Sequence, residues 1–521
     1  LQVIAKSYEA HKSFFLGGYK KLLGAGLLVV VNSAPSIFDD SKPHFTKNTQ
    51  HITKMLPYLC NEIWQLVFSN LEDTIDLDDG SDQGLYPFRK DTHIPTLTSL
   101  CLVSHRFYRL ARRNLYRTIS SVNVSRQQNK MKMGLLARTL LSNSELRSEI
   151  RAIDLSHSRD WQTSLVDSEF WPPCIERVEI PSRLRDLLKE DIDRHSTTEI
   201  ETCLLLALMP NLRMVALTDH QTKSKALTWI LGGELKNPQP GISDRPELVA
   251  NYLGQLEEVH WSPIPFKLGD WSNFSMEPLL LLPNIKKLFL SPFEPSFIIN
   301  KSMAQDFQSG LQSLRIDAGM IRPAFLQYNL SRCKALQNLD LDLTDCYDIE
   351  DTDLAVNLGE FGSVLRNFGQ DLVSLKLRFY EDEEYAQREI GSLKGLERLR
   401  HLSVPKFVLL GAGEGTIPLT EALPGSLETF EMEFVDEYWP KHSDTKAQES
   451  AADDDEVIRL FNNNRFPNLK EVVYGCYMND QDDRLTNFTK VKGWSVKNTA
   501  ELRCLTTTEP RYRRLELIRG D

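Results

Sequence analysis

One short apolar pattern recurs eleven times between Ile150 and Tyr474. Each copy has the order apolar-x-x-apolar-x-apolar, as in Leu311-x-x-Leu314-x-Ile316. Successive copies begin 25, 37, 44, 29, 26, 25, 36, 27, 28 and 42 residues apart. A recurring period of this size indicates one structural unit that is repeated and stacked. The copies begin at Ile150, Ile175, Leu212, Leu256, Ile285, Leu311, Leu336, Leu372, Leu399, Leu427 and Leu469.

Each copy predicts a loop that enters a short strand, whose alternate residues build a stacked core. Six of the ten intervals lie in or at the edge of the roughly 20–29-residue period of leucine-rich repeats. The four longer intervals would accommodate an insertion or a degenerate repeat. Many intervening segments look helical, as in Thr352–Asn367. Pro-Asn-Leu/Ile precedes three copies at one phase, at Pro210, Pro283 and Pro467, where the proline marks the end of a helix. We expect an α/β solenoid with parallel short strands and helices on the convex side.

The bulk composition excludes some classes of function. The chain has 521 residues, enough for more than one domain or for one domain and an elongated array. Its 61 basic and 72 acidic residues give a net charge of -11, which argues against a general nucleic-acid binder. None of the eight cysteines forms a C-x-x-C pair, a pattern typical of reduced thiols in the cytosol or nucleus. For the same reason we expect no structural zinc.

Residues 1–54 form an N-terminal extension without the repeat. Leu22–Val31 is a run of ten apolar and glycine residues, whereas a membrane span needs about 20. With Lys20-Lys21 before it and Asn32-Ser33-Ala34 after it, the run resembles a secretory signal. We favour a short buried segment, and we expect no membrane partner and a cytoplasmic and/or nuclear protein. The five N-x-S/T sequons would matter only if the chain were secreted.

Residues 55–119 contain two helical patterns. In the first, apolar residues from Leu59 to Leu71 follow steps of four, three, one and four, which place them on one helix face. The second runs from Leu97 through about Leu110, with Arg106, Arg109, Arg112 and Arg113 mostly on its outer face. Between the two lies an acidic spacer at 72–95, which predicts a solvated loop. Helices this short cannot bury all their apolar area alone and need a partner surface.

This segment resembles the F-box, the helical module that recruits a protein to a cullin-based ubiquitin ligase. The consensus sequence of the family begins L-P-x-E-I and continues with a V-S-R/K-x-F type of sequence. In fungal members it ends in Leu-Tyr. Here these parts read Leu59-Cys60-Asn61-Glu62-Ile63, Val103-Ser104-His105-Arg106-Phe107 and Leu115-Tyr116. Cys60 stands where the family has proline. The resemblance implies that nine side chains contact the ligase adaptor or shape the helices that do: Leu59, Cys60, Ile63, Val67, Phe68, Leu71, Leu100, Val103 and Phe107.

The remaining boundaries follow from the same patterns. Residues 120–149 predict a helical linker, 150–480 the leucine-rich-repeat solenoid and 481–521 a C-terminal cap or tail. An acidic stretch at His442–Glu456 interrupts the array. It could be an acidic interaction loop, but we favour a disordered surface insertion.

The remaining motifs do not predict an enzyme. Gly411-x-Gly413-x-Gly415 lacks the Lys-Ser/Thr of a phosphate-binding loop, which favours an inter-repeat loop. Asp340 and Asp342 alternate with leucines, so we expect them on the solvent-facing side of a strand, where they could add acidity to a concave surface. No metal-ligand cluster or nucleophile motif is present in the sequence. The basic run from Arg106 to Arg117 favours a solvated helix face or a rim that meets an acidic partner over nucleic-acid contact.

Taken together, the chain resembles F-box proteins with C-terminal leucine-rich repeats. That resemblance implies a non-catalytic substrate-recognition subunit of an SCF-type (cullin–RING) ubiquitin ligase. Its partners would be the ligase adaptor with its cullin complex and a target protein that the sequence does not identify, with no cofactor. The alternative is a leucine-rich-repeat scaffold or regulator without a ligase role. A hydrolase or transferase in an irregular α/β fold is disfavoured because no convergent catalytic site is present.

Overall fold

The computed structural model describes part of the chain, which divides into two compact units, Leu1–Thr118 and Ile119–Asp521. Eight of the nine residues with an implied adaptor role, all except Phe107, lie outside the described residues. The described residues are 101–102, 104–120, 135–155, 171–193, 197–219, 225–230, 253–263, 277–280, 282–290, 308–317, 321–343, 356–379, 386–387, 389–411, 417–432, 455–478, 491, 493–502 and 511–520.

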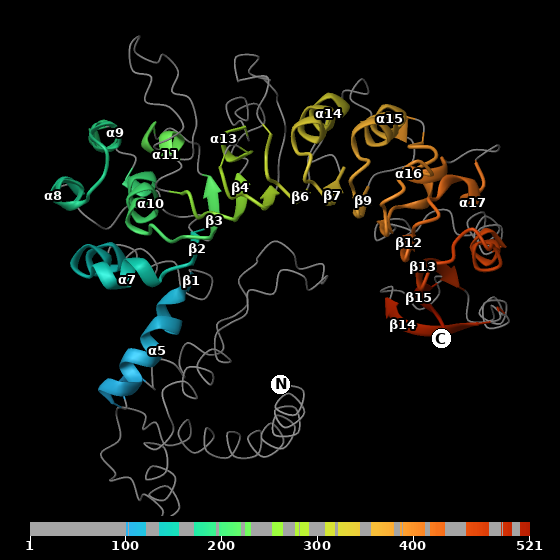
Figure 1. Cartoon of the computed structure of the whole chain (residues 1–521), viewed down its shortest axis with the longest axis horizontal. Coiled ribbons are helices and arrows are strands. Elements are labelled where there is room, and N and C mark those ends of the chain that lie inside the picture. Colours follow the sequence, from blue (N-terminus) through green and yellow to red (C-terminus); the bar gives the residue numbers. More distant parts are fainter. Residues whose placement is uncertain are drawn as a thin grey trace, which may run out of the picture. The chain divides into compact units, whose positions relative to one another are not determined.

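Thirteen strands form one open sheet in the order β1-β2-β3-β4-β5-β6-β7-β9-β11-β12-β13-β15-β14 (Figure 1). Neighbours from β2 to β13 are all parallel. The arrangement confirms the α/β class and is compatible with a solenoid. The bounds are β1 Thr118–Ser120, β2 Ala152–Leu155, β3 Met214–Asp219, β4 Glu258–Pro263, β5 Lys287–Leu290, β6 Ser313–Ile316, β7 Asn338–Asp342, β9 Ser374–Arg378, β11 His401–Ser403, β12 Thr429–Met432, β13 Glu471–Met478, β14 Trp494–Leu502 and β15 Arg511–Arg519.

Ten of the eleven predicted strands are present, and each begins two residues after the first apolar position of its copy. The backbone explains this constant phase. The amides of Gln312 and Ser313 both donate to the carbonyl oxygen of Lys286, at 2.8 and 2.9 Å. The amides of Gln337 and Asn338 both donate to Gln312 in the same way, at 2.9 Å. This double donation recurs at each strand from β3 to β13, so every repeat enters the sheet in the register of the one before.

The Pro-Asn motif closes turns between repeats. The Asn211 amide nitrogen donates to the Ser148 carbonyl oxygen at 3.0 Å, and Asn284 donates to Gly254 in the preceding repeat. Asparagine suits such turns because its short amide reaches backbone groups nearby. The motif therefore recurs where one repeat must be fastened to the previous one.

The strand expected at Ile175 is wrong, because this residue lies buried in helix α8 (Trp171–Arg177). The spacing of Ile175 and Val178 also fits a helix, and Pro172 and Pro173 sit in the first turn, where proline is tolerated. The interval from Ile150 to Leu212 is thus one long connection. It holds α8, α9 (Ser182–Asp193) and α10 (Thr197–Leu208).

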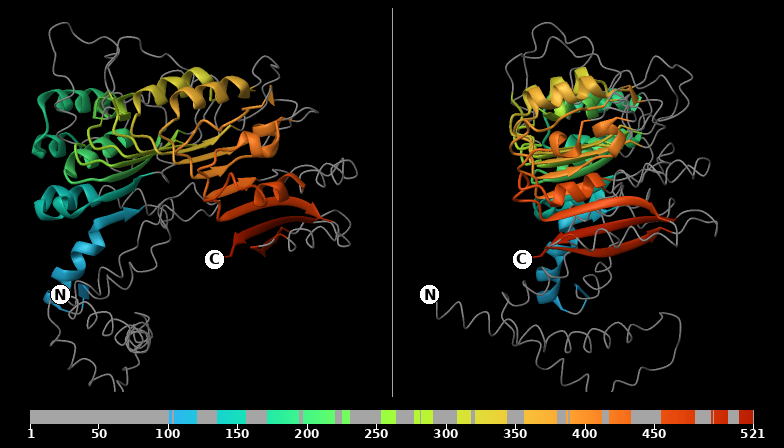
Figure 2. Two further views of the ribbon diagram at one scale, coloured as in Figure 1. Left: turned by 45° about the vertical axis from the view of Figure 1, so that its right-hand side comes forward. Right: turned by 90° about the vertical axis from the view of Figure 1, so that its right-hand side faces the viewer.

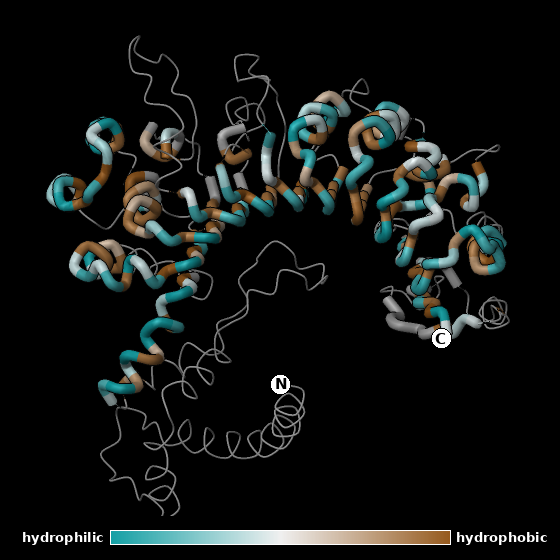
Figure 3. The backbone as a smooth tube through the Cα atoms, in the orientation of Figure 1, coloured by the Kyte–Doolittle hydropathy of each residue, from teal (hydrophilic) through white to brown (hydrophobic). Residues whose placement is uncertain are grey.

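Helices cover one face of the sheet, on the outer side of the strand row (Figures 1 and 2). Apolar and polar residues alternate along the strands in Figure 3, and β6 has the matching pattern: Leu314 and Ile316 are buried, Ser313 and Arg315 only partly. Leucines in this phase form the core between strands and helices. Further helices in the described part of this unit include α7 Ser144–Glu149, α11 Lys225–Ile230, α13 Glu277–Leu280, α14 Pro323–Arg332, α15 Leu358–Phe368, α16 Lys406–Leu410 and α17 Leu419–Ala422.

Two helical predictions need correction. Within 120–149, residues 135–142 and α7 are separate helices. They are separate because Asn143 caps α7, its Oδ1 accepting from the Leu146 amide at 3.3 Å. The helix expected at Thr352–Asn367 begins only at Leu358, since Asn357 caps α15 through the Glu360 amide at 3.1 Å. Val356 and Asn357 instead form β8, which pairs in parallel with β10 (Ala386–Gln387).

The C-terminal strands reverse direction. β15 runs antiparallel to β13 and β14 runs antiparallel to β15, so the parallel row ends in an antiparallel set. The register of β14 shifts between Asn498 and Ala500. Within the acidic stretch 442–456, the described residues Asp455 and Glu456 begin a helix, and Glu456 accepts a hydrogen bond from the Leu419 amide at 3.2 Å.

In the first unit, the described part centres on α5 (His105–Arg117). The helix expected from Leu97 to about Leu110 is wrong in its bounds, because Ser104 is extended and caps a helix that continues to Arg117. Ser104 Oγ accepts from the Phe107 amide at 3.2 Å. Cys101 and Leu102 are helical before this break.

Candidate binding surface

The face of the sheet turned away from the helices carries the polar strand residues between β4 and β12, and we call it the open face. Registered strands place its residues in rows. The first row is Glu258, Lys287, Ser313, Asn338, Ser374, His401 and Thr429. The second row is His260, Phe289, Arg315, Asp340, Lys376, Ser403 and Glu431.

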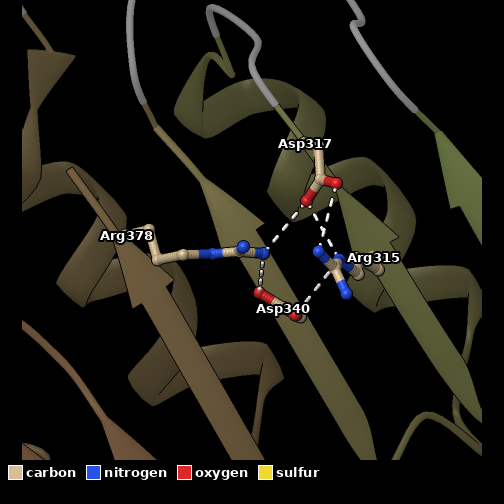
Figure 4. Close-up of polar contacts among 4 residues, drawn as sticks. All are labelled: Arg315, Asp317, Asp340 and Arg378. Carbon is tan, nitrogen blue, oxygen red and sulfur yellow. Dashed lines mark hydrogen bonds and ion pairs between the residues drawn. The ribbon is translucent and has the colours of Figure 1, made fainter. Parts of the chain in front are cut away.

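A charged network lies at the centre of the open face (Figure 4). Arg378 Nη2 donates to Asp340 Oδ1 at 2.7 Å and to Asp317 Oδ1 at 3.0 Å. Arg315 donates to both carboxylate oxygens of Asp317, at 2.9 and 3.2 Å, and its Nε lies 3.4 Å from Asp340 Oδ2. Two guanidinium groups therefore hold two carboxylates that come from β7 and from the end of β6.

The network is largely removed from water. The side chains of Arg378 and Asp317 are 9% and 10% exposed, and those of Asp340 and Arg315 are 25% and 28% exposed. Burial lowers the pKa of Arg378, but Asp340, Asp317 and Asp342 outweigh that effect and hold the pKa above its usual value. Arg378 thus stays charged, and its charge neutralises the buried carboxylates around it.

An aromatic stack continues the network toward β4. The guanidinium carbon of Arg315 lies 4.9 Å from the ring centre of Phe289. On its other side Phe289 stacks on His260, with ring centres 5.1 Å apart and planes inclined at 27°. His260 Nε2 lies 2.6 Å from Glu258 Oε1. Polar and aromatic groups on β4 to β9 are therefore held in one connected arrangement, which reduces the entropy that a partner must remove on binding.

The first row is less constrained. Lys287, Asn338 and His401 are exposed, and Ser313, Ser374 and Thr429 are half-buried. His401 Nδ1 lies 2.9 Å from Thr429 Oγ1. Hydroxyl, amide and ammonium groups of this kind can bind a polar chain that crosses the strands.

The expectation that Asp340 and Asp342 face solvent needs correction at Asp342, whereas Asp340 lies on the open face. Asp342 is 8% exposed and therefore does not face solvent, and Asp340 is engaged by both arginines. The sequence did not indicate this because the partners, Arg315 and Arg378, lie in other repeats. The sequence does indicate the position of Arg315 and Arg378 on the open face, because both alternate with apolar residues on their strands, as Asp340 does.

Of the residues with an implied adaptor role, the structure describes Phe107, which is buried with Ala111 on α5. On the same part of the chain, Leu102 is 84% exposed and Tyr108 is 40% exposed. His105, Arg109, Arg113 and Arg117, spaced four residues apart, are exposed along α5. Gly411 ends α16 with φ of 83°, and the rest of its glycine motif lies outside the described residues.

The described part of the chain offers neither a metal centre nor a membrane-spanning helix. Among the described residues, no group of three or more His, Cys, Asp or Glu side chains is arranged to hold a metal ion. Over the described ranges, no helix combines the length and apolarity needed to cross a bilayer. Comparison with known proteins adds no further candidate, because no protein-family model and no curated protein matches the chain.

Proposed function

We propose that the chain is a substrate-recognition subunit of an SCF-type ubiquitin ligase. The helical module at 55–119 binds the ligase adaptor, and the leucine-rich-repeat solenoid binds a target protein. The observation that carries the proposal is the combination, in one chain, of an F-box-like sequence from Leu59 to Tyr116 with an open, mostly parallel sheet.

The first half of the proposal rests on residue pattern. Ile63, Val67 and Leu71 recur at helical spacing in a module too short to cover its own apolar face. Burying each such side chain against an adaptor contributes about 1.5–3 kcal/mol, so a few are sufficient. In the described part of the module, Phe107 is buried and supports α5, while Leu102 and Tyr108 reach solvent.

The second half rests on the open face. Its side chains are fixed by leucines beneath them and by the ion pairs of Arg378, so a partner meets a preorganised surface. Such a subunit is non-catalytic: it acts by holding target lysines at a high local concentration near another protein's active site. The proposed location is the cytoplasm and/or nucleus.

Adaptor capture tests the assignment. The full chain is tagged, expressed in cells with the proteasome blocked, purified and analysed by mass spectrometry. Ile63→Asp and Phe68→Asp should each abolish recovery of adaptor and cullin, because a buried, unpaired charge is strongly unfavourable. Ile417→Asp is the matched control, since Ile417 is an exposed apolar residue of the second unit, and it should leave recovery intact.

The alternatives give different outcomes. Adaptor binding that survives both changes removes the F-box assignment. Recovery of a stable partner without adaptor or cullin from the unmodified chain favours a leucine-rich-repeat scaffold or regulator instead.

A further inference from the structure

Between β5 and β11 the open face presents two lysine side chains, Lys287 and Lys376, although the whole chain is acidic. Its central carboxylates are buried or engaged: Asp317 and Asp342 are buried, and Asp340 is bound by two arginines. Its lysines differ. Lys287 is exposed and Lys376 is half-buried, and the structure records no ion pair for either within the described part of the chain.

Lys376 remains available because of a diagonal pairing. Asp340 is its direct cross-strand neighbour in the β7–β9 register. The Asp340 carboxylate nevertheless turns to Arg378 at 2.7 Å and to Arg315 at 3.4 Å. The acidic group directly opposite Lys376 is therefore already neutralised, and the ammonium of Lys376 can bind an external anion.

Uncharged hydrogen-bonding groups lie between the two lysines. Ser313, Asn338 and Ser374 occupy the first row on β6, β7 and β9, starting beside Lys287 on β5. Lys376 lies three strand spacings, about 14 Å, across the sheet from Lys287 and two residues, about 7 Å, along it, a diagonal of about 16 Å. An extended peptide rises about 3.3 Å per residue, so groups about four or five residues apart would reach both lysines.

We call Lys287, Ser313, Asn338, Ser374 and Lys376 the strip. The charged groups at its two ends limit the binding region. Glu258, 13% exposed, lies at the β4 end next to His260, and Glu431 is half-buried on β12. Negative charge at both ends disfavours an anionic segment that extends further. The basic and polar part of the open face, from β5 to β11, is therefore the part with complementary charge.

We propose that this strip binds an extended peptide segment of a partner protein that carries two carboxylates about four or five residues apart. One carboxylate pairs with Lys287 and the other with Lys376, while Ser313, Asn338 and Ser374 bind the peptide backbone. A lysine is a point charge and serves one carboxylate well, whereas bidentate recognition of a phosphate favours arginine. Here Arg315 and Arg378 are occupied by aspartates, so the geometry favours two separate carboxylates over one phosphate.

This inference rests on the target-binding half of the proposed function, but its test does not involve the adaptor. Fluorescent peptides of about ten residues, a length that covers the strip at the rise of an extended chain, are titrated against the full chain and followed by anisotropy. One peptide has two glutamates separated by three neutral residues. A second has glutamines there, and a third has one phosphoserine and no glutamate. The glutamate peptide should bind most tightly, with affinity that falls as salt rises.

Paired variants locate the site. The double variant Lys287→Gln and Lys376→Gln should weaken binding of the glutamate peptide by about tenfold or more, since it removes both complementary charges. Lys334→Glu reverses an exposed lysine on the turn before β7 and should leave affinity within about twofold, as expected for a charge outside the site. Glutamine at both positions avoids placing a new carboxylate opposite Glu258 or Asp340, their direct cross-strand neighbours.

Three results would overturn the proposal: no binding of the glutamate peptide, equal losses in the double variant and in Lys334→Glu, or tighter binding of the phosphoserine peptide. Thermal melting of each variant separates a lost contact from a lost fold. Adaptor recovery by the same double variant should be unchanged, so failure of this inference and failure of the ligase assignment give different results.

Discussion

Arg378 on β9 donates a 2.7 Å hydrogen bond to Asp340 on β7, although Asp342 is the residue directly opposite it in the register. The same nitrogen reaches Asp317, at the end of β6, at 3.0 Å. One buried guanidinium therefore connects side chains from three consecutive strands of the sheet.

Removing this guanidinium should strongly destabilise the second unit, Ile119–Asp521. Arg378→Met removes one of the two guanidinium groups that neutralise the buried carboxylates and leaves Arg315 alone to pair with them, so we expect a loss of up to about 3–5 kcal/mol in the free energy of unfolding. Chemical denaturation followed by circular dichroism measures it. Arg398→Met is the control, because Arg398 also lies 2.7 Å from a carboxylate, that of Asp371, but both side chains are more than half exposed. Its loss should be within about 1 kcal/mol. Equal losses would show that the Arg378 network contributes no more than a surface pair.

A second prediction concerns the packing of α15. Gly362 faces the chain near Ile390, where an added Cβ would lie 1.9 Å from the Ile390 carbonyl oxygen. Gly362→Ala should therefore shift the helix and lower the free energy of unfolding by about 1–3 kcal/mol. Gly395→Ala makes the same change where nothing lies within 4 Å, and should be neutral or slightly stabilising. A Gly362 variant as stable as the Gly395 variant would contradict this close approach.

The buried thiols give a probe of local opening. Burial raises the pKa of Cys333 to about 12, and burial also raises the pKa of Cys203 well above its usual value. Because the thiolate is the reactive form, both should react with a thiol reagent at pH 8 at least about tenfold more slowly than an exposed cysteine. Site-resolved mass spectrometry measures the rates. Cys101 is half-buried, so despite its raised pKa it should react before either.

Denaturant provides the control for that experiment. Reaction at Cys333 and Cys203 should accelerate together as the repeats unfold, since both lie in the second unit. Fast labelling of Cys333 in the native protein would contradict its burial at the end of α14.

The sequence predicted the strands well because each strand depends on apolar residues that lie next to it in the chain. The first apolar residue of a copy, such as Leu311, is followed two residues later by a strand in ten of eleven copies. The failure at Ile175 has a local cause too, since Pro172 and Pro173 favour the first turn of a helix there. The helix starts at Leu358 and Ser144 were missed because each is set by the asparagine before it, which caps the helix. A cap of this kind does not change the spacing of apolar residues.

The central network could not be predicted in the same way. Register alone places Asp340 opposite Lys376, yet its hydrogen bond comes from Arg378, two residues further along β9. Which cation reaches the carboxylate depends on side-chain length and on burial, and both are properties of the packed sheet. Position on the open face was predictable from the alternation with leucines, whereas the pairing was not.

The cap of α5 allows a final prediction in the first unit. Ser104 Oγ accepts the Phe107 amide at 3.2 Å, which satisfies one of the free amides at the start of the helix. Ser104→Ala should destabilise α5 by about 1 kcal/mol. Hydrogen exchange of the amides from Phe107 to Ala111 should then accelerate, by about fivefold for a loss of that size. Exchange in the second unit should be unchanged and serves as the internal control.

Ser104→Asp separates capping from side-chain size. An aspartate accepts the same amide and adds negative charge at the positive end of the helix, so exchange should stay at or below the rate of the unmodified chain. If both variants exchange alike, the start of α5 is held by the packing of Phe107 and Ala111 and not by its cap. Because α5 belongs to the module with the proposed adaptor role, Ser104→Ala should also weaken adaptor recovery. Ser104→Asp should recover as much adaptor as the unmodified chain.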